Sequence, residues 1–282
     1  MPDYRSGDRA LLHYDVLGDA SACPVIVLAG GAARHPTYLG DLAGLSQRWQ
    51  LIVPHLRGVG RSAHADLTER GSFWRQADDI EHLRRELQID QCVVAGHSAG
   101  TRLAVSFAAQ FTDRLKGLLL ITPPSAYLVD VASDTDAMAA ARRGDPEFDA
   151  AVVARDIGPD TSDDMTFNVW QHAIAPLAYA SFGPVERAHD RSGGEWSLAA
   201  ARAYLAVDPP ADLAKQLRSV DVPTLVIAGA NDLSTGVAPV VALADLFPKG
   251  RLAMIDNCGH YPWVEQPRAF RAAVDPFLEA VC

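Results

Sequence analysis

Six short apolar runs, each ended by a turn residue, constrain the fold of this chain more than any other feature. Longer stretches with apolar residues at helical spacing separate them. Alternation of this kind is typical of an α/β fold with a mostly parallel sheet. Continuous runs rich in β-formers fit strands that are buried on both faces. The predicted strands cover residues 25–29, 51–53, 92–95, 118–121, 224–228 and 251–255.

Between these runs, the spacing of apolar residues predicts helices over residues 75–87, 103–111, 237–247 and 268–281. Residues 123–212 break the alternation, because they contain helical pieces, eight aromatic residues and no clear strand. We therefore expect an α/β core made of residues 1–122 and 213–282, with residues 123–212 inserted as a helical cap, or lid.

Composition excludes several classes of function. The 282 residues suffice for one large domain with an insertion or for two small domains, and 49% of them are hydrophobic. The formal net charge of −10 argues against nucleic acid as a partner, since nucleic-acid binders are usually basic. No apolar run reaches the roughly 18 residues that a membrane helix needs. The N-terminus has no apolar segment typical of a signal peptide.

The four cysteines are scattered, with no C-x-x-C pair. This spacing indicates neither a zinc site nor a disulfide framework. A reducing, cytoplasmic setting with no metal and no cofactor is the resulting expectation. The oligomeric state stays open.

Residues 96–100 read G-H-S-A-G and match the pattern G-x-S-x-G. The pattern describes a sharp turn between a strand and a helix, which exposes the serine and needs glycines where side chains would clash. A predicted strand precedes the motif and a predicted helix follows it, as the turn requires. Ser98 is therefore the candidate nucleophile.

A serine nucleophile needs a base and an acid that orients the base. His260 follows the last predicted strand directly, and Asp232 follows the strand before it. Catalytic groups in sheets of this kind lie at the carboxyl ends of the strands. The chain order Ser98, Asp232, His260 is the order that this fold uses.

The oxyanion of an acyl-transfer reaction needs two backbone N–H donors. We predict that Ala99, next to the serine, supplies one donor and that Gly31, after the first predicted strand, supplies the other. The glycine-rich stretch 57–62, R-G-V-G-R-S, lacks the Walker pattern and is interpreted as a structural turn rather than a phosphate-binding loop.

Together these motifs resemble the α/β-hydrolase superfamily over about residues 10–122 and 213–282. The chain looks most like proline iminopeptidase-type enzymes, mainly because of the sequence C-G-H-Y-P-W at 258–263. It departs from them at 29–33, where A-G-G-A-A replaces His-Gly-Gly-Pro-Gly. The resemblance implies cap carboxylates that hold a free amino group. The cap residues expected to bind substrate are Glu195, Glu186, Trp196, Trp170 and Tyr127.

These observations predict a cofactor-free serine hydrolase that cleaves an ester or amide bond of a small molecule or short peptide. An aminopeptidase like the proline iminopeptidases is one form of it. An esterase, lactonase or thioesterase acting on a specialised metabolite is the alternative. A non-hydrolytic binding protein or cyclase-like catalyst on the same fold is a further alternative, because fold alone does not determine function.

Overall fold

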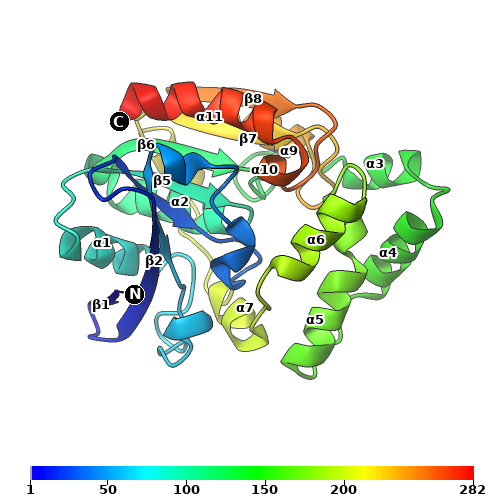
Figure 1. Cartoon of the computed structure of the whole chain (residues 1–282), viewed down its shortest axis with the longest axis horizontal. Coiled ribbons are helices and arrows are strands. Elements are labelled where there is room, and N and C mark those ends of the chain that lie inside the picture. Colours follow the sequence, from blue (N-terminus) through cyan, green and yellow to red (C-terminus); the bar gives the residue numbers. More distant parts are fainter. Residues whose placement is uncertain (1) are drawn as a thin grey trace.

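The computed structural model describes residues 2–282, and its centre is an eight-stranded sheet (Figure 1). The strand order is β1-β2-β4-β3-β5-β6-β7-β8. The pairs β1–β2 and β2–β4 are antiparallel, and all other neighbours are parallel. The strands are β1 (Asp3–Arg5), β2 (Leu11–Leu17), β3 (Pro24–Leu28), β4 (Gln50–Pro54), β5 (Cys92–His97), β6 (Leu115–Ile121), β7 (Thr224–Gly229) and β8 (Gly250–Ile255).

The structure confirms all six predicted strands and the mostly parallel sheet. It adds β1 and β2 at the edge, which the apolar pattern did not reveal. Strand β1 has only three residues, and β2 mixes His13 and Asp15 with apolar residues. Neither strand therefore carries a continuous apolar run.

Helices cover both faces of the sheet. In β5, Val94 faces one hydrophobic cluster, while Val93 and Ala95 face the other, as the two-residue repeat of a strand requires. The first face is covered by α1 (Ala77–Glu86), α2 (Gly100–Gln110), α8 (Leu213–Leu217) and α9 (Ala238–Ala244), and the second by α10 (Pro262–Glu265) and α11 (Pro267–Val281). The 3-10 helices are η1 (Pro36–Leu39), η2 (Leu45–Gln47), η3 (Gly60–Ser62), η4 (Thr112–Arg114) and η5 (Ala175–Ala178).

A helical segment, here called the β6–β7 segment, lies between β6 and β7 and forms the green lobe at the right of Figure 1. Polar N-caps that the sequence encodes start three of its helices: Asp145, Asp163 and Ser197 each accept backbone N–H groups. Besides α8, its helices are α3 (Thr135–Ala141), α4 (Pro146–Ile157), α5 (Asp164–Ala173), α6 (Pro184–Ser192) and α7 (Leu198–Tyr204).

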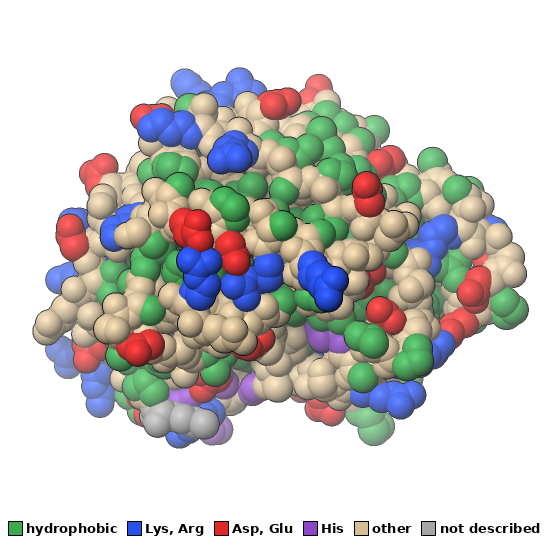
Figure 2. Space-filling view, turned by 45° about the horizontal axis from the view of Figure 1, so that its top comes forward, with side chains coloured by type: hydrophobic (Ala, Val, Ile, Leu, Met, Phe, Trp, Pro, Cys, Tyr) green, Lys and Arg blue, Asp and Glu red, His purple; other side chains and the backbone are tan. Residues whose placement is uncertain are grey.

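The surface carries charges of both signs. Figure 2 shows basic and acidic side chains interspersed over the face that includes α11, where Arg271 pairs with Asp275. Among residues 2–282, no helix combines the length and the hydropathy that a membrane crossing demands.

A disulfide joins Cys23 to Cys282, so the expectation of no disulfide is wrong for this pair. The partners are 259 residues apart and meet only because α11 ends beside the start of β3. Cys92 and Cys258 are buried free thiols. Disulfides persist mainly in oxidising compartments. The Cys23–Cys282 disulfide therefore takes away the support that the scattered cysteines gave to a reducing setting.

Arg57, in the glycine-rich stretch after β4, is fully buried and pairs with two carboxylates. Its Nε and Nη2 donate to Asp79 at 2.7 and 2.8 Å, and its Nη1 and Nη2 donate to Asp8, both at 2.9 Å. These bonds tie the loop to α1 and to the N-terminal turn. The stretch thus has a structural task, in keeping with its interpretation as a turn.

We expect Arg57→Leu to lower the free energy of unfolding by about 3–5 kcal/mol, because it leaves the buried carboxylate of Asp79 without its partner. Urea denaturation measures this loss. Arg114→Leu is the matched control, since the Arg114–Asp90 pair is exposed and should contribute less than about 1 kcal/mol. Equal effects of the two substitutions would contradict the assigned role of Arg57.

Candidate active site

Ser98 lies in the turn between β5 and α2 and has a φ of +50°, a left-handed backbone that serine rarely adopts. The neighbouring glycines allow this turn. A Cβ at Gly96 would lie 2.8 Å from the carbonyl oxygen of Gly100, and a Cβ at Gly100 would lie 2.3 Å from the carbonyl oxygen of Leu28. The strand, the turn and the helix therefore pack too closely for any side chain at these two positions.

A cavity of about 440 Å³ opens above Ser98. The core contributes Ser98 and His260 to its lining, and the β6–β7 segment contributes Phe167, Leu177 and Trp196 among others. The cavity therefore lies between the carboxyl edge of the sheet and the β6–β7 segment, with Ser98 at its floor.

His260 and Asp232 are both buried and form a hydrogen bond of 2.8 Å between Nδ1 and Oδ2. A carboxylate only accepts, so the Nδ1 proton of His260 points to Asp232 and leaves Nε2 with a lone pair. Asp232 also accepts from the backbone N–H of Ser234 and from Thr235 Oγ1, at 2.8 and 2.7 Å. These bonds fix the carboxylate and, through it, the orientation of the imidazole.

The backbone N–H groups of Gly31 and Ala99 donate no hydrogen bond to any of residues 2–282. Gly31 lines the cavity beside Ser98, and Ala99 precedes the first residue of α2. Free N–H groups at the start of a helix attract negative charge. Among residues 2–282, the residue that follows Ser98 in the chain and a residue that lines the cavity with Ser98 thus each have an unpaired backbone N–H.

A chain of buried hydrogen bonds connects the loops around the cavity. The N–H of Gly30 donates to Tyr38 Oη at 2.6 Å, and Tyr38 Oη lies 2.8 Å from Nδ1 of His97. Nε2 of His97 donates to the carbonyl oxygen of His260 at 3.0 Å. Burial holds the pKa of His97 well below its ordinary value, so the ring is neutral and Nδ1 accepts from Tyr38. His97 therefore has a structural role that joins three loops.

Glu265, in the G-H-Y-P-W-V-E motif, holds the loop that carries His260, a role that the sequence analysis did not assign. Its carboxylate accepts the N–H groups of Ala180, Gly259 and Tyr261 at 2.7, 3.0 and 3.3 Å. Burial nevertheless raises its pKa to about 7. A glutamate six residues after Gly259, just beyond the loop that carries His260, is the signal that could have pointed to it.

Of the five residues expected to bind substrate, only Trp196 lines this cavity. The side chain of Glu186 caps α6 by accepting the N–H of Gly183, and Glu195 is exposed beside two other surface pockets. Trp170 donates to the carbonyl of Ala154, and Tyr127 lines a separate pocket. The charged residues that do line the cavity, all missed from sequence, are Arg34, Arg155 and Asp190.

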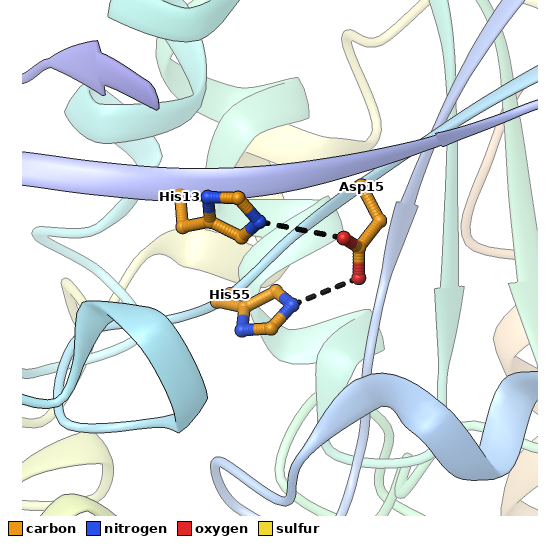
Figure 3. A group of neighbouring side chains, drawn as sticks. All are labelled: His13, Asp15 and His55. Atoms are coloured by element: carbon orange, nitrogen blue, oxygen red, sulfur yellow. Dashed lines mark hydrogen bonds and ion pairs between the residues drawn. The ribbon is translucent and has the colours of Figure 1, made fainter. Parts of the chain in front are cut away.

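A cluster of His13, Asp15 and His55 has the composition of a metal site (Figure 3). The Nε2 atoms of both histidines point toward Asp15, at 3.4 Å for His13 and 2.9 Å for His55. However, Nδ1 of His55 accepts the N–H of Arg61, so its proton lies on Nε2, where a metal would need a lone pair. Nδ1 of His13 pairs with Asp3 at 2.6 Å. We interpret the cluster as a chain of polar contacts between β1, β2 and the loop after β4.

Residues 24–267 match the alpha/beta hydrolase fold family, and the chain belongs to this family. A pimeloyl-[acyl-carrier protein] methyl ester esterase of Nitrosospira multiformis is 27% identical over 94% of this chain and 97% of its own. A protein of Leptolyngbya boryana named probable proline iminopeptidase is 35% identical, but only over 39% of this chain and 34% of its own. The esterase RhEst1 of Rhodococcus sp. ECU1013 has a similar fold, with a TM-score of 0.75 at 22% identity over 100% and 99% of the two chains.

The raised pKa of Glu265 makes a pH-dependent contribution to stability. Between its ordinary pKa near 4.5 and its folded value of about 7, the folded protein holds a proton that the unfolded chain has lost. The contribution is therefore complete below about pH 4.5 and is lost as the pH rises through 7. We expect the difference in unfolding free energy between wild type and Glu265→Gln to be larger at pH 5 than at pH 8, by at most about 3 kcal/mol.

Urea denaturation at the two pH values measures this difference. Glu69→Gln is the control, because Glu69 is exposed and its ion pair among residues 2–282 is with Arg75 on the surface. A difference between wild type and Glu265→Gln that does not change with pH would contradict the assignment.

Proposed function

We propose that this protein is a serine hydrolase that cleaves an ester bond of a small molecule. Ser98 Oγ attacks the carbonyl carbon while His260 Nε2 takes the hydroxyl proton. The imidazolium then gives this proton to the leaving alcohol, and an acyl-serine remains. Water, activated by the same histidine, attacks the acyl group and releases the acid, which restores Ser98.

The hydrogen bond between His260 and Asp232 is the observation that carries this proposal. It sets the tautomer in which Nε2 can accept a proton, and it stabilises the imidazolium that forms. His260 and Ser98 line the same cavity. A hydroxyl and an available imidazole nitrogen in one cavity are what nucleophilic catalysis requires.

Gly31 and Ala99 supply the oxyanion donors in this proposal. Their N–H groups have no partner among residues 2–282 and flank Ser98. Donors that are already fixed in place stabilise the tetrahedral intermediate without reorganising during the reaction. Residues 123–212 act as the cap, which excludes water from the cavity and strengthens these contacts.

An ester fits better than a peptide. Relatives that align over nearly the whole chain include a protein named as a methyl ester esterase and others named as putative carbamate hydrolases, whereas the iminopeptidase match covers 39% of the chain. An aminopeptidase would need a cap carboxylate for the substrate ammonium, and neither Glu195 nor Glu186 lines the cavity. Asp190 does line it, but its carboxylate already accepts from His172 Nδ1 at 2.9 Å.

Ser98→Ala should lower turnover by a factor on the order of 10³ or more, because the proposed catalytic residues Ser98, His260 and Asp232 act as a unit. A fluorophosphonate should add its mass to the peptide that contains Ser98 in the wild type only. Ser181→Ala, which removes an exposed serine away from the cavity, should keep both activity and labelling. Full activity of Ser98→Ala would contradict the proposal.

A hydrolysis screen of the purified protein separates the remaining alternatives. Short-chain esters should be cleaved well, and aminoacyl arylamides, proline included, should be cleaved poorly. Lactones and thioesters belong in the same screen. Preference for an arylamide would favour the aminopeptidase. Fluorophosphonate labelling of Ser98 without turnover of any substrate would favour the non-hydrolytic alternative.

A further inference from the structure

Arg34 is a buried cation without an acidic partner. Its side chain is 2% exposed, yet none of the salt bridges among residues 2–282 includes it. Nε donates to the carbonyl oxygen of Gly194 at 3.0 Å, while Nη2 is buried and has no hydrogen-bond partner in the part of the chain that the structure describes. Arg57, equally buried, pairs with two carboxylates. A buried guanidinium normally needs such a partner, so Arg34 lacks an anion.

The protein is built to hold Arg34 in this place. Its guanidinium carbon lies 4.6 Å from the ring centre of Tyr38 and 3.9 Å from that of Trp196, so the two rings support the cation. A Cβ at Gly193 would lie 2.1 Å from Nη2, so only glycine leaves room for the guanidinium there. These contacts position the charge before any ligand arrives.

Trp196 supplies a second donor without a partner. Its Nε1 is buried and makes no hydrogen bond to any of the described residues. A Cβ at Gly31 would lie 2.5 Å from this nitrogen, which places the indole N–H beside Gly31, one of the two proposed oxyanion donors. Asn168 fixes the tryptophan backbone through two hydrogen bonds of 2.9 Å. Nη2 of Arg34 and Nε1 of Trp196 therefore belong to side chains that stack on each other at one wall of the cavity.

The other charged groups of the cavity already have partners. Arg155 contacts Asp156 at 2.9 Å, and Asp190 contacts His172 at the same distance. His97 is neutral, and His260 is bound to Asp232. Among the described residues that line the cavity, Arg34 is thus the cation that no carboxylate neutralises. It is the group that would attract an incoming anion.

We infer that Arg34 and the Trp196 indole N–H form an anion subsite, which binds a carboxylate carried by the substrate apart from its scissile ester. A carboxylate matches the guanidinium because it is planar, presents two oxygens and carries one negative charge. The inference rests on the proposed function for the ester, but binding of the carboxylate itself does not require turnover. The substrate class is therefore the half-ester of a dicarboxylic acid or a similar acidic ester.

Matched substrates test this subsite. The wild type should cleave the monomethyl esters of succinate, glutarate or adipate at least about tenfold better in kcat/KM than the corresponding dimethyl esters. Arg34→Met should lower kcat/KM for the preferred half-ester by roughly tenfold to a hundredfold and change the diester by less than about threefold. Trp196→Phe keeps an aromatic ring at this position but loses the indole N–H, and should show the same selectivity in weaker form.

Arg155→Met is the control, because this second arginine of the cavity is already paired and should not alter the half-ester to diester ratio. Loss of the ratio in Arg155→Met but not in Arg34→Met would overturn the assignment. Circular dichroism establishes that each variant is folded. If Arg34→Met does not fold, Trp196→Phe and the wild-type substrate ratio still decide the question.

Calorimetric titration separates this proposal from the proposed hydrolysis. Glutarate should bind the wild type, and its affinity should fall at least about tenfold in Arg34→Met, while neutral glutaramide should not bind. Binding with this pattern but no cleavage of any ester supports the subsite and counts against the hydrolase. Cleavage of neutral esters with no half-ester preference and no glutarate binding overturns the subsite and leaves the hydrolase standing.

Discussion

The site depends on one buried hydrogen-bond chain through His97. The neutral ring accepts from Tyr38, whose hydroxyl in turn accepts the N–H of Gly30, and it donates to the carbonyl oxygen of His260. Three loops from distant parts of the sequence are thereby held at fixed separations at the carboxyl edge of the sheet. Since all of these groups are buried, any broken bond in the chain would leave a polar atom without a partner.

Around this chain, close backbone packing determines where Ser98 lies. The absence of side chains at Gly96 and Gly100 lets β5, the turn and α2 approach to within contact of β3. The left-handed backbone at Ser98 is a local strain that the surrounding sheet and helix maintain. Glu265 performs a similar task for His260, because three backbone N–H groups converge on its carboxylate.

The two buried arginines show how one residue type serves two purposes. Arg57 neutralises Asp8 and Asp79 and ties the N-terminal turn to α1, which stabilises the fold. Arg34 lies between aromatic rings at the cavity wall and has no carboxylate within ion-pair distance among residues 2–282. In the proposed anion subsite, the counterpart of this unpaired charge is a ligand rather than a residue of the fold. This contrast is the basis for assigning acidic esters to the cavity.

The sequence alone determined the features that depend on local patterns. Six strands and the fold family followed from apolar runs, and the expected positions of Ser98, Asp232 and His260 followed from strand ends and chain order. The apolar runs did not reveal β1 and β2, because β1 has only three residues and β2 mixes polar residues with apolar ones. The tertiary structure alone decided the partners that are distant in sequence: the Cys23–Cys282 disulfide, the His97 chain and the unpaired state of Arg34. It also placed Glu195 and Glu186 outside the cavity, because the direction of a side chain in the β6–β7 segment depends on how helices pack, which no local pattern encodes.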